Sequence, residues 1–96
     1  MTEVLLFPLV GEFAENKDIA RELRVKILAP ALKQGKTIVI DFVGVGSATQ
    51  SFIHALISEL IREHGAEAID MLSFKNCNET IKKIISIVVA YMQESE

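Results

Sequence analysis

The stretch TIVIDFVGVGSATQSFIHALISEL, residues 37–60, decides the fold of this chain. It opens with a β-branched run that predicts a strand over residues 37–42, and so continuous a run is typical of a strand buried on both faces of a parallel sheet. A loop with two glycines follows. Apolar residues then recur at helical spacing, which predicts a helix from about residue 50 to residue 64, opened by Thr49 or Ser51.

Strands and helices also alternate before this stretch. Residues 3–10 (EVLLFPLV) predict a strand, and Pro8 within it is typical of an edge position or a strand end. Asn16 predicts the N-cap of a helix, because its side chain can accept a hydrogen bond from a backbone N–H. Pro30 predicts that this helix ends or kinks near Ala29.

The same alternation continues to the end of the chain. Residues 68–74 (AIDMLSF) predict a third strand, and Asn76 or Asn78 is expected to cap a third helix. The predicted order is therefore β-α-β-α-β-α, which is typical of α/β domains whose parallel strands are joined by right-handed crossovers. We expect a single small domain over residues 1–96, with a mostly parallel sheet covered by helices.

Composition and charge exclude several classes of protein. The chain has 96 residues, 50% of them apolar, which fits one folded domain rather than a disordered segment. Its formal net charge is −3 and its lysines and arginines are scattered, so no nucleic-acid partner is expected. Cys77 is the one cysteine and cannot form an internal disulfide, and no apolar run approaches the roughly 20 residues of a membrane span. We expect a cytoplasmic protein that does not enter a membrane.

The candidate functional surface is the edge of the sheet where the strands end. Binding sites in open parallel sheets form at the carboxyl ends of the strands, and a helix start adds unpaired N–H groups that favour anions. Both features follow the central strand in this chain. The candidate residues are Asp41, Gly44, Gly46, Ser47, Thr49 and Ser51.

Most of these candidates have a structural alternative. Thr49 and Ser51 are either phospho-acceptors and anion-contacting hydroxyls, or helix caps. Asp41 is either a charged group that a partner or metal ion contacts, or a carboxylate that accepts hydrogen bonds from N–H groups of the loop and fixes its turn. Gly44 and Gly46 lack the signature of a phosphate loop, so turn geometry explains them better than nucleotide binding does.

The remaining polar residues indicate no catalytic or metal site. His54 and His64 lie on the second predicted helix, and no set of cysteines, histidines and carboxylates at metal-ligand spacing accompanies them. Cys77 precedes a helix start, but the sequence names no histidine base beside it. We therefore expect a protein without a cofactor and without enzymatic activity.

The third predicted helix carries more apolar surface than one packing face requires. A helix on a sheet needs an apolar stripe somewhat wider than 100°. Three residues widen the arc here: Ile87, Val89 and Tyr91. They indicate either a surface for a partner or a second copy of the chain, or deeper burial in a small core.

Three stretches resemble one known fold. They are VLLFPLVGEF (4–13), IVIDFVGVGSATQSF (38–52) and SFKNCNETIKKII (73–85), and together they span about residues 3 to 92. They resemble the STAS fold, the module of bacterial anti-sigma factor antagonists and of sulfate-transporter tails. More closely, they resemble a small STAS-like family of unknown function found in bacteria and phages.

The resemblance implies a regulatory role and a partner. Anti-sigma factor antagonists carry Asp-Ser-Ser/Thr-Gly at the start of their second helix, and a partner kinase phosphorylates the first hydroxyl. This chain has Thr49-Gln50-Ser51-Phe52 there, so Gln50 aligns with the phospho-acceptor and Ser51 keeps a hydroxyl at the next position. The serine followed by phenylalanine, Ser51-Phe52, is similar to the pattern at this position in the closer STAS-like family.

The function expected from these observations is a non-enzymatic protein-interaction module. Its partner would be a histidine-kinase-like ATPase or an anti-sigma-type regulator, docked on the loop after the second strand and the start of the second helix. Two alternatives stay open: a protein that binds a small ligand or nucleotide, and a structural subunit such as a homodimer that packs through the third helix.

Overall fold

The computed structural model describes residues 2–94 and confirms the α/β class, with a parallel sheet flanked by helices. The main sheet contains β1 (Thr2–Leu5), β3 (Ile38–Asp41) and β5 (Leu72–Lys75) in the order β1-β3-β5, and both pairings are parallel. The stretch quoted first thus supplies the central strand. Ile38 lies opposite Thr2 on one side and opposite Leu72 on the other.

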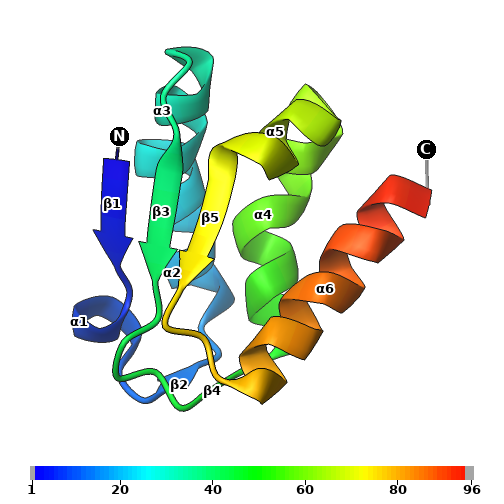
Figure 1. Ribbon diagram of the computed structural model, residues 1–96. Helices are drawn as coiled ribbons and strands as arrows, with labels where there is room; N and C mark the ends of the chain where they lie inside the picture. Colours follow the sequence, from blue (N-terminus) through cyan, green and yellow to red (C-terminus); the bar gives the residue numbers. More distant parts are fainter. Residues whose placement is uncertain (1, 95–96) are drawn as a thin grey trace.

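The helices that connect these strands lie behind the sheet in Figure 1, and α6 lies at the right of that view beside α4. A continuous helical segment, composed of α2 (Lys17–Leu23), η1 (Arg24–Leu28) and α3 (Ala29–Lys33), leads from β1 to β3. The helix α4 (Gln50–His64) leads from β3 towards β5, and α6 (Glu79–Glu94) follows β5 and packs on α4. The core lies between these helices and the inward side of the strands. Its largest fully buried side chains are Leu6, Leu28, Ile38, Ile40, Phe42, Phe52, Ile53, Leu56, Ile57, Leu60, Ile61 and Ile81.

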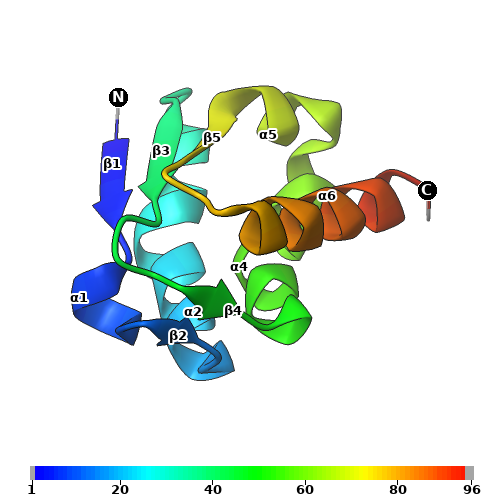
Figure 2. The same ribbon diagram turned by 60° about the horizontal axis from the view of Figure 1, so that its bottom comes forward.

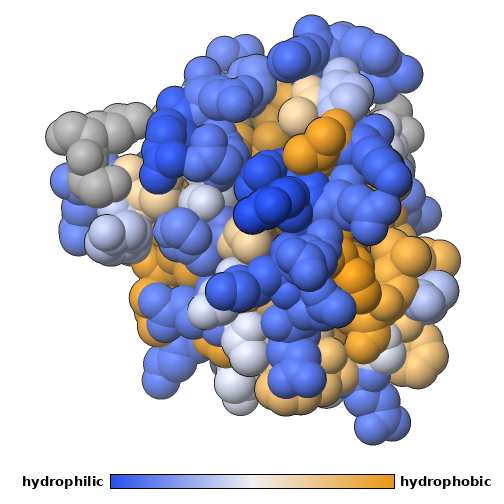
Figure 3. Space-filling view, turned by 180° about the vertical axis from the view of Figure 1, so that it is seen from behind, coloured by the Kyte–Doolittle hydropathy of each residue, from blue (hydrophilic) through white to orange (hydrophobic). Residues whose placement is uncertain are grey.

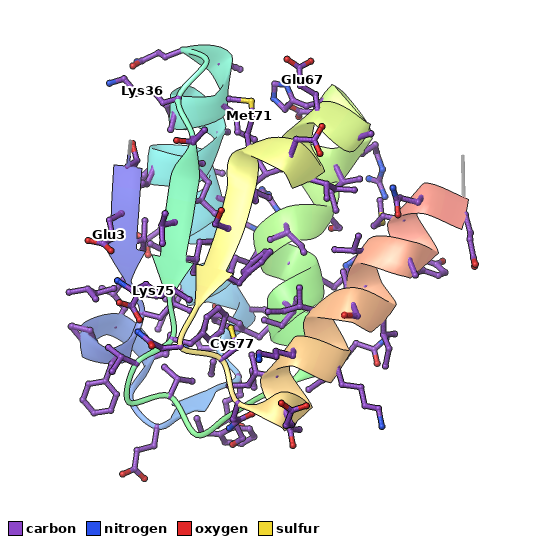
Figure 4. All side chains as sticks on the ribbon, in the orientation of Figure 1. Glu3, Lys36, Glu67, Met71, Lys75 and Cys77 are labelled. Carbon is purple, nitrogen blue, oxygen red and sulfur yellow. The ribbon has the colours of Figure 1, made fainter. Side chains whose placement is uncertain are left out.

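The helices cover one face of the sheet, so the expectation that the central strand is buried on both faces holds only in part, although Ile38, Ile40 and Asp41 of that strand are buried. On the open face Leu5 is 51% exposed and Val39 is half-buried. Glu3 and Lys75 reach towards one another across this face, with their charged atoms 3.8 Å apart (Figure 4). The β-branched run predicted the strand correctly, but its composition could not show whether a second layer covers it.

Two predicted strands are shorter than expected. The first ends at Leu5, and the following residues form one helical turn, α1 (Phe7–Val10), with Pro8 in the position where a missing N–H costs no hydrogen bond. The third begins at Leu72, because the residues before it form α5 (Ala66–Met71). Apolar residues in short runs fit either structure, and these two runs became helical.

Pro30 does not end its helix. It lies in the first turn of α3, which continues to Lys33. The wider turn η1 precedes it, where the Ala29 N–H donates to the Arg24 carbonyl five residues back. The irregular turn therefore marks the position where the proline was expected to end or kink the helix.

The expected caps are confirmed. The Asn16 side chain accepts hydrogen bonds from the N–H groups of Asp18 and Ile19, and Thr49 and Asn78 cap α4 and α6 in the same way. Within residues 2–94, the helices are all too short or too polar to cross a membrane.

Sequence reasoning missed a second, smaller sheet. In it β2 (Phe13–Ala14) pairs in parallel with β4 (Ser47–Ala48). Figure 2 brings this pair forward, below the ends of the main strands and beside α1 and the start of α4. The pair ties the segment before α2 to the loop that leads into α4.

Candidate functional site

The segments that carry the candidate residues lie along the margin below the carboxyl ends of the main strands (Figures 1 and 2). This margin is called the rim below: the loop after β3, the β2–β4 pair, the start of α4, the turn after β5, and α1. Parallel strands bring their ends to one edge, so the rim gathers segments that are far apart in the sequence.

Asp41 fixes the loop rather than pointing into solvent. It is 6% exposed, and its Oδ1 accepts hydrogen bonds from the Val43 N–H and from Asn76 Nδ2, each 2.9 Å long. The bond from Asn76, then that from Val43, and to a smaller extent the charge of Lys75 lower the pKa of Asp41 from its ordinary value. Asp41 therefore acts as a carboxylate that holds the turn, which was the structural alternative for this residue.

Two asparagines that sequence reasoning used only as possible helix caps connect the strand ends. Asn76 adopts a left-handed backbone with φ 59° and reaches the loop after β3 through its bond to Asp41. Asn78 Nδ2 donates to the Gly46 carbonyl over 2.7 Å, while its Oδ1 accepts the Ile81 N–H and caps α6. Asparagine suits both roles because it tolerates positive φ and carries a donor and an acceptor.

The two loop glycines have different roles. Gly44 has φ +86°, and a Cβ on it would lie 2.8 Å from Cδ1 of Phe7, so the loop needs glycine both for its backbone and for its packing. Gly46 is not in the left-handed region, and its N–H donates to the Glu12 carbonyl over 2.8 Å. Ser47 follows in β4 with an exposed side chain. Turn geometry and pairing account for this loop.

The two hydroxyl candidates are in different situations. The Thr49 Oγ1 accepts the Phe52 N–H at 3.0 Å, so this hydroxyl caps α4. Ser51 is exposed in the first turn and lies in a hollow with Lys17 and His54. The structure thus divides the candidate set. Asp41 and the glycines belong to the turns below the strands, whereas Ser51 faces α2.

A group of exposed apolar side chains surrounds these turns. They lie on β1, α1, β2 and the loop after β3, and range from 43% to 52% exposed: Leu5, Phe7, Leu9, Phe13 and Val43. We call them the rim patch. The sequence contained a signal for them, because apolar residues continue past the strand into α1 and into the loop.

The apolar surface extends beyond the rim patch onto α2. From Leu9 it continues into a shallow hollow of about 240 Å³ lined also by Ile19, Leu23 and Ile27, with Glu22 and Lys26 at its border. In the view from behind, hydrophobic side chains gather toward the right-hand edge of an otherwise mostly hydrophilic face (Figure 3). The Glu22 and Lys26 side chains form an ion pair, 2.7 Å long.

The three residues that widen the apolar arc of α6 fall into two groups. Val89 packs against the core, as the burial alternative expected. Ile87 and Tyr91 are 47% and 59% exposed, so the burial alternative does not hold for them. The Tyr91 ring lies 6.5 Å, between centroids, from that of His54 on α4.

Cys77 is half-buried and packs against the core. Burial raises the pKa of the Cys77 thiol, which lowers the fraction of reactive thiolate. The part of the chain that the structure describes contains no group of three histidine, cysteine, aspartate or glutamate side chains placed to hold a metal ion.

Comparison with known proteins supports the resemblance found in the sequence. Residues 20–82 match the model of a family described as a STAS-like domain of unknown function. The match begins in α2 and reaches the start of α6, so it includes the six candidate residues. A search of curated proteins and a search of solved structures each found no match.

Proposed function

This chain belongs to the family of STAS-like domains of unknown function, and we propose that it is a regulatory module that binds a protein partner through its rim. The partner is a histidine-kinase-like ATPase or an anti-sigma-type regulator, and the complex forms in the cytoplasm. The chain itself carries out no reaction. The rim patch is the observation on which this proposal mainly rests.

Exposed apolar side chains support docking because they cluster. Single exposed apolar residues are normal on protein surfaces, whereas contiguous patches mark interaction sites. Leu5, Phe7 and Val43 come from three segments that meet at the rim, and Leu9 extends the patch into the apolar hollow beside α2. A partner that buries this surface gains roughly 25 cal/mol for each Å² of apolar area.

The rim also has the rigidity that a docking surface benefits from. Asn76 and Asn78 tie the turn after β5 to the loop after β3, and the Glu12 carbonyl holds Gly46 and Ser47 from the other side. A surface ordered before binding costs less conformational entropy when the complex forms. The hydrogen bonds that order these turns therefore lower the entropic cost of docking on the rim.

Modification of Ser51 is the regulatory step in this proposal. Thr49 uses its hydroxyl as a cap, while the Ser51 side chain is exposed in the first turn of α4. A phosphate there adds about −1.5 to −2 charges next to the docking surface. We expect the aspartate variant Ser51→Asp to change the affinity for the partner.

A matched pair of variants tests the docking surface. Val43→Asp places a charge in the rim patch, and Val25→Asp makes the same change on η1, outside the patch, at similar exposure (52% and 57%). Binding to a purified histidine-kinase-like ATPase is measured by calorimetry, after circular dichroism has shown that both variants fold. We expect Val43→Asp to weaken binding at least tenfold and Val25→Asp to leave it unchanged. Equal effects of the two changes on binding, or the absence of a complex with any such ATPase, would refute the proposal.

Self-association through α6 is a second candidate, supported by the exposure of Ile87 and Tyr91. Sedimentation of the unmodified chain and of Ile87→Asp separates this candidate from the first. A dimer that dissociates in the variant supports it, and a monomer at high concentration excludes it.

A further inference from the structure

A groove runs between α2 and α4 and adjoins the rim at the start of α4. It consists of two adjoining hollows of about 510 and 470 Å³, which share Lys17, His54 and Ala55 in their walls. We call it the α2–α4 groove. The back of the molecule, where these helices lie, is largely hydrophilic (Figure 3).

One wall of the groove is a row of cations. Lys17, Arg21 and Arg24 are spaced by four and then three residues, which puts them on one side of the α2–η1 segment. Within residues 2–94 none of these three side chains has a carboxylate within ion-pairing distance. The Arg24 Nη1 donates to the Ala55 carbonyl over 2.9 Å and so holds its guanidinium against the opposite wall.

The opposite wall is polar and comes from α4. Ser51, His54 and Ser58 are spaced by three and then four residues, so they follow one another along the helix and face the row of cations. The Tyr91 ring of α6 lies beside the His54 imidazole, with the two ring centroids 6.5 Å apart. This wall supplies hydroxyl and imidazole groups that can donate hydrogen bonds to an oxyanion.

The two ends of the groove differ in charge. Among residues 2–94, no acidic side chain lines the end formed by Lys17, Gln50, Ser51 and His54. The other end contains Asp18 and Glu59 beside the two arginines, and Glu59 is already paired with Arg62. The first end, with one lysine and hydrogen-bond donors from α4, fits an anionic group, and the second fits the polar remainder of the same molecule.

We propose that the α2–α4 groove binds a small phosphomonoester, with its phosphate at the end formed by Lys17 and Ser51. A phosphate monoester is a dianion near neutral pH and offers several acceptor oxygens, which matches the donors on the two walls. The site rests on the two facing walls and not on the helix start alone. The protein carries a net charge of −3, so its overall charge does not attract an anion to this place. The inference goes beyond the proposed docking function and does not depend on it.

Titration of the ¹⁵N-labelled chain tests the groove. O-phosphoserine and adenosine monophosphate are added at near-physiological salt, each beside its unphosphorylated counterpart, serine or adenosine. We expect at least one phosphorylated probe to cause saturable shifts of the amide signals of residues 17, 51 and 54, with a millimolar or lower Kd. Their unphosphorylated counterparts should cause no such shifts.

Two double variants with the same change in charge distinguish specific binding in the groove from general electrostatic attraction of the anion. Lys17→Gln/Arg21→Gln removes two cations from the groove, and Lys82→Gln/Lys83→Gln removes two from the surface of α6. We expect the first pair to weaken binding at least tenfold and the second to leave it unchanged. Equal losses in the two variants, shifts that do not saturate, or equal binding of acetate would overturn the proposal.

Discussion

Replacing Gly44 with alanine tests the packing that shapes the rim. The new Cβ would lie 2.8 Å from Cδ1 and 3.0 Å from Cγ of Phe7, so the ring has to move. The backbone at Gly44 also has φ +86°, which an L-residue rarely adopts. The substitution therefore strains the loop and displaces one member of the rim patch.

The expected loss of stability can be worked out from these two contributions. The left-handed backbone costs an L-residue about 1–2 kcal/mol, and the lower entropy of the unfolded alanine chain offsets about 0.4–1 kcal/mol of this. Moving the half-exposed Phe7 ring adds about 1 kcal/mol, the lower end for overpacking. The sum is about 2 kcal/mol, or a decrease in Tm of about 8–16 °C for a domain of this size.

Urea and thermal unfolding, followed by far-ultraviolet circular dichroism, measure this loss against two other glycines. Gly35 has φ +74° with nothing within 4 Å of a Cβ, so Gly35→Ala reports the backbone contribution alone, about 1 kcal/mol. Gly46 has no positive φ, and its Cβ would meet the Glu12 carbonyl at an ordinary 3.7 Å, so Gly46→Ala should be nearly neutral.

The Phe7→Ala background completes the test. Without the ring, Gly44→Ala should cost only what Gly35→Ala costs. If the cost of Gly44→Ala does not change in that background, the ring contact contributes nothing and the reasoning fails. A Gly44→Ala chain as stable as Gly46→Ala would contradict both contributions.

Three further predictions concern the polar groups of the rim. Asn78→Ala removes a helix cap and the bond to the loop after β3, and should lower the free energy of unfolding by about 2 kcal/mol, whereas Asn78→Asp keeps the cap and should lose about half of that. Thr49→Ala should cost about 1 kcal/mol in urea unfolding and Thr49→Ser much less, because serine keeps the capping oxygen. The pKa of Asp41 is lower in the folded chain than in the unfolded chain, so the carboxylate stabilises the fold at pH values above the unfolded pKa. This stabilisation is lost as the pH falls below about 5. Asp41→Asn should therefore make the decrease in Tm between about pH 5 and pH 3 shallower, and an unchanged slope would show that the carboxylate contributes nothing.

Much of the architecture could be predicted because it depends on local patterns. The β-branched run predicted β3, and the helical spacing predicted α4 and α6. Thr49 and Asn78 were each one of two residues expected to cap these helices. Capping and periodicity act within one turn or one strand, so a single sequence contains the necessary information. The membership of the STAS-like family was visible in the same stretches.

The short elements could not be predicted in this way. The two residues of β2 become a strand only because β4 lies beside them, more than thirty residues later in the chain. The runs in α1 and α5 are apolar enough for a strand, and their helical form depends on the turns at each end. Pairing and packing of this kind are set by distant parts of the chain.

The sequence by itself determined the alternation of strands and helices, the caps and the presence of an acid, glycines and hydroxyls near one edge. Only the tertiary structure decided what they do. Asp41 meets Asn76 from 35 residues away, Gly44 meets the ring of Phe7, and Ser51 turns towards α2. These contacts join segments that are distant in the chain, and their partners are chosen by how the helices and strands pack rather than by any local pattern.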